Sequence, residues 1–210
     1  MLMRQIRRAA LAGLLTLTPG AATAQVETIC QIVQVTDGAV TIRRGRTRVD
    51  AVVGHVLATG DLIRTDAEGR ATVMCDSGLT MNVGPGTRID LEALLVPASR
   101  GAGVRILEGI AGFLLPRPRP GGFQVRTPSA VAAVRSTEWA VTVDGRAMTT
   151  FVRKGRVVVG GRLGEAVALT QGQGVDVTSR GAVGSVTNWG TGRIDALDTR
   201  LGSDWQARAR

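Results

Sequence analysis

The stretch TEWAVTVDG at residues 137–145 decides the fold class. Thr137, Trp139, Val141 and Val143 occupy every second position in it. Alternation with a period of two is the pattern of a strand that buries one face, and an Asp-Gly pair is typical of a tight hairpin turn. This stretch therefore predicts a β-strand that ends in a hairpin turn at residues 144–145.

The same alternation recurs on both sides of this hairpin. Short apolar runs that end in glycine turns or polar turns lie near residues 40–42, 71–75, 79–83, 157–159 and 175–177. Turns that recur about every 8–12 residues are typical of sandwiches and barrels. The 28 glycines of the chain argue against a helical bundle. We therefore expect an all-β fold, an antiparallel β-sandwich of jelly-roll type.

The C-terminal segment follows a different period. Beyond Gly190, the residues Ile194, Leu197, Leu201 and Trp205 follow one another at spacings of three and four. Such spacing places them on one face of a helix. We expect a short amphipathic helix that packs against the sheet; docking to a partner is the alternative.

The first 24 residues have the composition of a secretory signal peptide. A cationic start at residues 1–8 precedes an uncharged apolar run at 9–17, and small side chains end at Ala24. This is the order of a signal peptide, and the run is shorter than the roughly 20 residues that span a bilayer. We expect cleavage near Ala24 and a soluble periplasmic chain without a transmembrane segment; a membrane anchor or a buried helix is the alternative. The mature chain would hold a β domain at 25–180 and a tail at 181–210.

The chain has two cysteines, Cys30 and Cys75, and the expected export bears on whether they form a disulfide. An even number of cysteines in an oxidising compartment favours a disulfide. Closing a loop of about 45 residues would stabilise the fold by roughly 4 kcal/mol. The alternative is that Cys75 is a buried thiol on the strand face that it shares with Ala71 and Val73.

Composition argues against most catalytic and metal sites. The chain has one histidine, His55, and two cysteines, too few for common zinc sites or for a triad with its own base. The carboxylates near glycine turns lack the alternate spacing of a calcium loop, and no G-x-S-x-G motif is present. We expect no enzymatic activity, no cofactor and no bound metal.

Four segments are more specific than the alternating strand pattern. They are GDLIRTDAEGRATV at 60–73, DSG at 76–78 followed by MNVGPGTRI at 81–89, TPSAVAAVRSTEW at 127–139, and QGQGV at 171–175. In this order they resemble the FecR domain of Gram-negative bacteria, over roughly residues 38–177. Cys75 and Ser136 depart from the family pattern, which often has an aromatic residue and a glycine there. We interpret the matching motif residues as structural: Gly60, Asp61, Arg64, Thr65, Gly69, Arg135, Thr137 and Glu138.

Within this motif set, Arg135 and Glu138 lie close together in an apolar run. We expect a structural ion pair, buried or half-buried, that fixes the register of a hairpin, because a lost partner of a buried charge is costly. A ligand contact is the alternative.

The family resemblance also shapes the expected function. FecR-type regulators have a cytoplasmic anti-sigma segment, one transmembrane helix and a periplasmic sensory part, whereas this sequence resembles a stand-alone periplasmic FecR domain. We expect a non-enzymatic interaction, sensory or scaffold module that binds an envelope protein. An envelope enzyme is the least favoured hypothesis.

A second hypothesis is binding of an anionic envelope polymer or polysaccharide. The chain carries a formal charge of +9, which becomes +6 without residues 1–24. Nucleic acid is not an expected partner, because export separates the protein from it and aromatic residues are scarce. A basic patch would attract a polyanion, and its candidates are Arg43, Arg44, Arg46, Arg48, Arg117 and Arg119. The last two lie in the proline-rich stretch 116–122, which reads as a solvated connector or, alternatively, a docking site.

Overall fold

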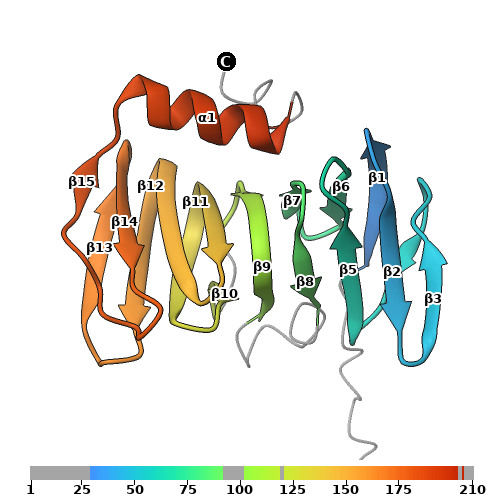
Figure 1. Ribbon diagram of the computed structural model, residues 1–210, viewed down its shortest axis with the longest axis horizontal. Coiled ribbons are helices and arrows are strands. Elements are labelled where there is room, and N and C mark those ends of the chain that lie inside the picture. The colour runs from blue at the N-terminus through green and yellow to red at the C-terminus, as the bar shows by residue number, and fades with distance from the viewer. Residues whose placement is uncertain (1–28, 92–101, 119–120, 203–204, 206–210) are drawn as a thin grey trace, which may run out of the picture.

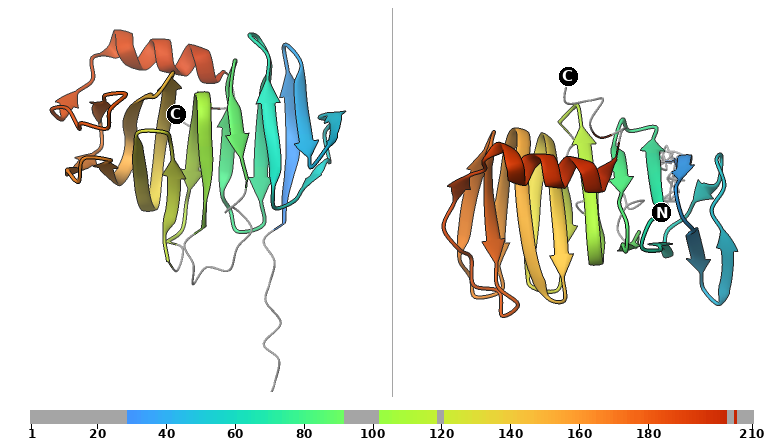
Figure 2. Two further views of the ribbon diagram at one scale, coloured as in Figure 1. Left: turned by 60° about the horizontal axis from the view of Figure 1, so that its bottom comes forward. Right: turned by 45° about the horizontal axis from the view of Figure 1, so that its top comes forward.

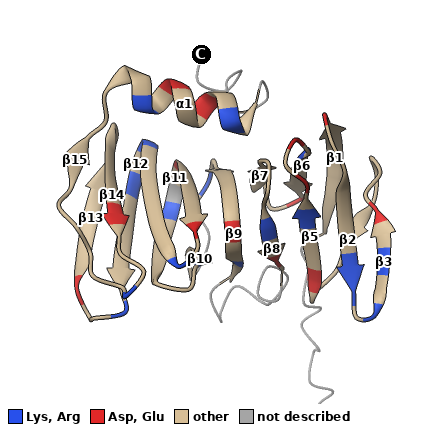
Figure 3. Ribbon diagram, in the orientation of Figure 1, with Lys and Arg blue, Asp and Glu red and all other residues tan. Residues whose placement is uncertain are grey.

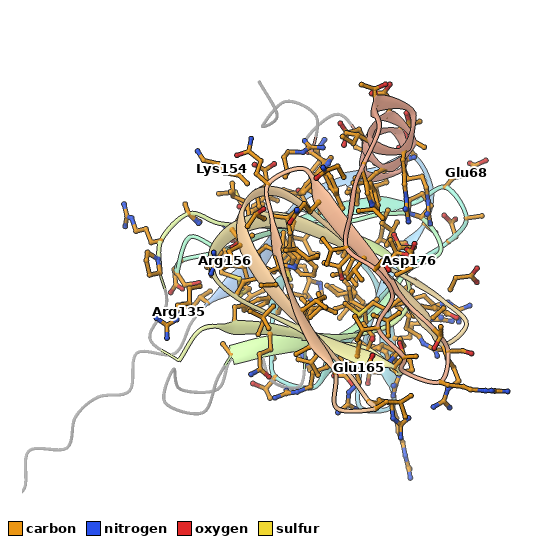
Figure 4. The ribbon with its side chains drawn as sticks, turned by 90° about the vertical axis from the view of Figure 1, so that its left-hand side faces the viewer. Glu68, Arg135, Lys154, Arg156, Glu165 and Asp176 are labelled. Atoms are coloured by element: carbon orange, nitrogen blue, oxygen red, sulfur yellow. A yellow bond between two sulfur atoms is a disulfide. The ribbon has the colours of Figure 1, made fainter. Side chains whose placement is uncertain are left out.

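The computed structural model describes residues 29–91, 102–118, 121–202 and 205. The predicted signal peptide and Arg119 lie outside these residues. In the described part, 15 strands form one continuous hydrogen-bonded sheet. The long strands of this sheet bend, so that it folds into two layers (Figure 1), and side chains fill the space between the layers (Figure 4). The expected all-β fold is confirmed.

One layer, called the open layer below, contains nine strands or parts of strands. From one edge to the other they are β13 (Ala166–Thr170), the second half of β12 (Ala147–Gly161), the first half of β11 (Ala130–Asp144), β10 (Phe123–Arg126), the first half of β9 (Ala102–Leu115), β8 (Arg88–Asp90), β5 (Asp61–Thr65), β2 (Val40–Arg44) and β3 (Thr47–Asp50). The neighbouring strands are antiparallel except β9 and β10, which are parallel.

The other layer, called the covered layer, contains the remaining halves of the long strands. Its order is β15 (Thr187–Asn188), β14 (Gln173–Val177), the first half of β12, the second half of β11, the second half of β9, β7 (Thr80–Val83), β6 (Arg70–Cys75), β1 (Cys30–Thr36) and β4 (Val56–Leu57). The predicted hairpin is the β11–β12 connection, in which Asp144 pairs with Ala147.

The long strands cross between the layers at irregular positions. The register of β11 and β12 shifts between Val134 and Thr137, and again at Trp139. Gly155 of β12 lies at the same crossing with a φ of 91°, and Gly109 marks the crossing of β9 with a φ of 92°. Bulges bend a strand and increase its twist, and glycine adopts positive φ without steric cost. These two features let one strand serve both layers.

Alternating side chains from both layers fill the interior. The largest of them is Trp139, which is fully buried and stacks on Phe113 with 5.0 Å between ring centroids. Phe123 packs edge-on against the same indole at 5.9 Å. Because Phe123 belongs to the open layer and Phe113 to the covered layer, this aromatic cluster joins the two layers through the largest apolar surfaces available.

Helix α1 (Thr191–Leu201) lies across the outer face of the covered layer (Figure 2). Leu197 and Leu201 pack there with Ile110, Ala140 and Phe151, and Trp205 joins them just beyond the helix. The expected short C-terminal helix is thus confirmed, and it packs on the sheet. No helix within the described ranges has the length and apolar character that crossing a bilayer requires.

A disulfide joins Cys30 of β1 to Cys75 of β6, as the sequence predicts. The two residues are directly opposite each other in the antiparallel pair, with a Cα–Cα distance of 4.0 Å. The bridge closes a loop with a sequence separation of 45 residues. It therefore ties the start of the described chain to the covered layer.

We expect the double substitution Cys30→Ala/Cys75→Ala to lower the free energy of unfolding by about 4 kcal/mol, because the unfolded chain regains the entropy of the closed loop. Urea unfolding of the oxidised protein and of the variant measures this difference. The native protein in reductant should approach the variant. A loss below about 1 kcal/mol would contradict the loop-entropy account of this bridge.

Candidate functional site

The outer face of the open layer carries an unusual number of arginines. Along most of its strands, arginines occupy outward positions that alternate with buried residues: in β5, Ile63 is buried and Arg64 is exposed. We call this surface the basic face. Its charged residues are Arg43, Arg48, Arg64, Arg88, Arg105, Arg126, Arg135 and Arg156, together with Asp50, Asp90 and Glu108. Figure 3 shows the basic positions on β2, β3, β5 and β8.

Strand register places several of these arginines in adjacent positions. Arg43 pairs with Arg48, and Arg64 with Arg88. Arg105 and Arg126 form a third such pair across the parallel strands β9 and β10. Neighbouring strands lie about 4.8 Å apart, so each pair places two arginines in adjacent positions on the basic face. Like charges in adjacent positions disfavour each other, and an anionic partner would relieve that effect.

The acidic residues on the basic face occupy defined places between the arginines. Glu108 forms an ion pair with Arg88 at 3.8 Å. Asp90 lies opposite Arg105 of β9 on one side and half-buried Leu62 of β5 on the other, and Asp50 is the register partner of Thr41. The three acids leave an excess of arginine on this face, and the resulting positive potential would raise the local concentration of an anionic ligand.

One end of the basic face is hollowed. A depression of about 910 Å³ lies where β11 and β12 cross between the layers. Its lining includes Gln124, Ala133, Val158, Arg135 and Arg156. Arg135 and Arg156 lie with Lys154 on the same side of the molecule (Figure 4). The depression therefore combines small apolar side chains with a basic rim.

The structure separates the arginines of the predicted basic patch. Arg43 and Arg48 lie on the basic face, and Arg46 lies in the turn of the β2–β3 hairpin. Arg44 instead pairs with the buried Asp61. Arg117 is exposed beyond the end of β9, where strand register does not connect it to this face. Of the arginines predicted to form a basic patch, Arg43 and Arg48 therefore lie on the basic face.

Asp61, one of the predicted motif residues, is a fully buried carboxylate at the start of β5. It accepts hydrogen bonds from Nε and Nη2 of Arg44, both at 2.7 Å, and from the Ala58 N–H at 2.8 Å. Burial alone would raise its pKa, but the hydrogen bonds from Arg44 and Ala58, with the charges of Arg44 and His55, lower the pKa below its ordinary value. This bidentate contact fixes the β2–β3 hairpin against β5.

Further motif residues hold turns around the same strands. The Thr65 hydroxyl donates to the Gly84 carbonyl at 2.7 Å and accepts from the Thr87 N–H at 2.8 Å. Gly69 approaches the Ala39 carbonyl so closely that a Cβ would lie 2.5 Å from its oxygen. Gly60 has a φ of 84° in the turn that precedes β5. These contacts explain why hydroxyl and glycine residues occupy the motif positions.

Asp66, which lies between Thr65 and Gly69 in the sequence, accepts three backbone hydrogen bonds. The donors are the N–H groups of Ala39, Gly69 and Glu68, at 2.8, 2.6 and 3.1 Å. These hydrogen bonds lower the pKa of Asp66. The carboxylate thus organises its own turn and joins it to the strand start at Ala39.

The third motif connects the sheet to α1. Thr137 donates its hydroxyl to the Arg156 carbonyl at 2.9 Å, across the crossing of β11 and β12. Glu138 is buried and forms an ion pair with Arg153 of β12 at 3.8 Å. Arg153 also pairs with Asp198 of α1. Arg135, the residue expected to pair with Glu138, is exposed on the basic face. The charged network therefore extends from Glu138 to the helix.

Trp205 completes this network. Its Nε1–H donates to Asp198 at 2.9 Å, and the Arg153 guanidinium lies 4.4 Å from the centre of its ring. Gly112 leaves the space for the indole, because a Cβ at this position would lie 2.5 Å from the ring. The network holds α1 on the covered layer and leaves the basic face open.

Groups of histidine, cysteine and carboxylate residues with the geometry of a metal site are absent from the described ranges. Two of the three carboxylates of the basic face, Glu108 and Asp90, lie opposite Arg88 and Arg105. The charge of each arginine would repel a cation at these carboxylates.

Comparisons with known proteins agree with this fold. The family model described as FecR protein matches residues 61–158. Two solved structures of a proposed anti-sigma factor from Parabacteroides distasonis align with TM-scores of 0.55 and 0.53 at 21% and 20% sequence identity. Each alignment covers 64% of this chain, and 63% and 62% of the other chain, so they share the fold over less than two thirds of that protein. No curated protein matches the sequence at a significant level.

The buried Asp61 predicts a specific response to acid. Because its pKa is lowered in the folded state, the folded protein binds fewer protons than the unfolded chain near pH 4. The stabilisation is present above the ordinary carboxyl pKa and is lost as the pH falls through the folded-state pKa. We expect Asp61→Asn to lose about 2 kcal/mol at pH 7, because Arg44 and Ala58 lose a charged acceptor.

The measurement is urea unfolding of the native protein and the variant at pH 7, 5 and 3. The difference between the two proteins should shrink towards pH 3. Asp195→Asn, which changes an exposed carboxylate on α1, serves as the control and should leave the pH dependence nearly unchanged. A constant difference between Asp61→Asn and the native protein at all three pH values would exclude the assigned role.

Proposed function

We propose, from the membership of residues 61–158 in the FecR family, that this chain is a non-enzymatic, exported module for protein interaction or sensing at the cell envelope. The family match supports a regulatory or sensory interaction domain. The signal-peptide composition of residues 1–24 and the Cys30–Cys75 disulfide support the proposed export to the periplasm. In this layout, the β domain and the C-terminal tail act as one periplasmic unit.

The observation that carries the proposal is the contrast between the two outer faces. The covered layer is occupied by α1 and Trp205 along β9, β11 and β12. The basic face exposes Arg43, Arg48 and Arg64 on short strands whose positions are fixed by the sheet. Rigid positions lower the entropic cost of binding, and arginine is enriched in protein interfaces. We therefore assign partner binding to the basic face and infer an acidic surface on the partner.

A photoreactive residue at position 64 tests this assignment in cells. Arg64 is exposed on β5, within the basic face, so an envelope partner should give one dominant adduct by mass spectrometry. The matched control carries the same residue at Asp195, on the exposed side of α1. Equal adducts from both positions, or none from position 64, would refute partner binding by the basic face.

Binding of an anionic polysaccharide is the second candidate function. It is favoured by the adjacent arginine pairs on β2–β3, β5–β8 and β9–β10. A polymer with regularly spaced negative charges can contact several such pairs at once. In this function, exposed charges carry the affinity, and salt screens them over about 8–10 Å.

Sulfated dextran is a suitable probe for this second function. We expect its affinity to decrease steadily with salt and to fall about tenfold in Arg43→Gln/Arg64→Gln/Arg126→Gln, because three exposed ion pairs of about 0.5 kcal/mol each are removed. The control Arg146→Gln/Arg180→Gln/Arg200→Gln removes the same charge away from the basic face. Binding that ignores salt, or an equal loss in the control, would exclude polymer binding by this face.

A further inference from the structure

Strand β3 forms a free edge of the open layer. It pairs with β2 alone among the described strands. All four of its residues, Thr47, Arg48, Val49 and Asp50, are exposed. A strand edge with exposed backbone groups is a template for pairing with another strand. The edge is short, so the strand that it accepts must fit a short and defined register.

The hydrogen bonds of the hairpin show which backbone groups face outward. The Ala51 N–H donates to the Val40 carbonyl at 2.8 Å, so residues 40 and 51 form a hydrogen-bonded pair. Such pairs alternate with non-hydrogen-bonded pairs along an antiparallel ladder. Val49 therefore points its N–H and C=O toward β2, whereas Arg48 and Asp50 point theirs toward the free edge.

We propose that β3 pairs antiparallel with β3 of a second copy of this chain, centred on Val49. In this register Arg48 of each copy lies opposite Asp50 of the other. These are the residues whose backbone groups face outward, so the two strands can form four backbone hydrogen bonds. The side chains of Arg48 and Asp50 lie on the same face, because they are two residues apart in a strand. Two ion pairs accompany the backbone contacts.

The distribution of charge selects this register. A shift by two residues in one direction would place Arg48 opposite Arg48, and a shift in the other direction would place Asp50 opposite Asp50. Like charges directly opposite each other are destabilising in an antiparallel pair. An edge with charges of one sign would block self-pairing, whereas the Arg-Val-Asp sequence complements itself.

Apolar side chains next to the edge support the same partner. Val49 is 42% exposed, and Val52 and Val53, which follow β3, are 60% and 66% exposed. In the proposed register the two copies of Val49 form the central non-hydrogen-bonded pair, in which side chains are closest. The contact is small, so we expect a weak dimer that forms with rising concentration.

This dimer would enlarge the basic face. The two-fold axis of an antiparallel strand pair is perpendicular to the sheet, so the outer faces of both open layers lie on the same side. Arg43 and Arg48 of the two copies then lie beside the shared edge. This self-association goes beyond the proposed function, and either one can hold without the other.

Charge exchange at the edge provides the test. Sedimentation velocity of the purified mature protein, up to millimolar concentration, should show a monomer–dimer equilibrium. Arg48→Asp alone and Asp50→Arg alone should each be monomeric, because each places like charges opposite each other. An equimolar mixture of these two variants should form a heterodimer, and Arg48→Asp/Asp50→Arg in one chain should dimerise again.

Arg46→Asp is the control, because it changes the charge of the same hairpin at its turn, outside the proposed pairing. We expect this control to dimerise about as strongly as the native protein. Circular dichroism confirms that each variant is folded, which is expected for exposed positions. A monomeric native protein, a dimer that persists in both single variants, or a mixture that stays monomeric would each overturn the proposal.

Discussion

The pairing of β11 with β12 continues from one layer into the other, and both layers depend on it. From Ala130 to Asp144, β11 passes through the open layer and then the covered layer, and β12 returns along it. A bulge in β11 and the positive φ of Gly155 in β12 occur at the same crossing. The two strands therefore bend together and keep their hydrogen bonds on both sides of the bend. Trp139 follows this crossing directly and fills the interior between the layers.

The crossing also explains why the outer face of the covered layer differs from the basic face. Glu138 points outward immediately after the bend and meets Arg153 of β12, which reaches Asp198 and Trp205. A buried acid of this kind needs a cation, because an unpaired buried charge is costly. The helix provides the remaining partners and shields the network from water. On one face of the sandwich, α1 thereby covers β9, β11 and β12, whereas the basic face stays exposed.

Local patterns predicted the fold well. Alternating side chains, the Asp-Gly turn, the helical spacing near the C-terminus and the cysteine pair all depend on residues whose arrangement the sequence shows directly. The β9–β10 parallel pair was not predicted, because register between non-consecutive strands depends on the whole sheet. The ion pair of Glu138 was predicted with Arg135, because Arg135 is close to it in the sequence. A register shift at the crossing brings Glu138 to Arg153, and sequence distance does not reveal such a shift.

The basic face was only partly predicted because its arginines come from several separate strands. The four arginines at residues 43–48 looked like one cluster, but alternation sends Arg43 and Arg48 outward and leaves Arg44 to pair with Asp61. Arg64 and Arg126 each follow a buried apolar residue in their own strand. This signal, an arginine at the outward position of successive strands, can be found in a sequence once the inward positions are known.

The pattern of the basic face favours a protein partner over a uniform polymer. Asp50, Asp90 and Glu108 interrupt the arginines at fixed positions and would repel a chain that carries only negative charge. A protein surface can place its own cations opposite these acids and its carboxylates opposite the arginines. The depression beside Ala133 and Val158 adds small apolar surface, which protein interfaces bury at their centre. Mixed charge and a depression that combines small apolar side chains with a basic rim therefore favour recognition of one shaped, mainly acidic surface.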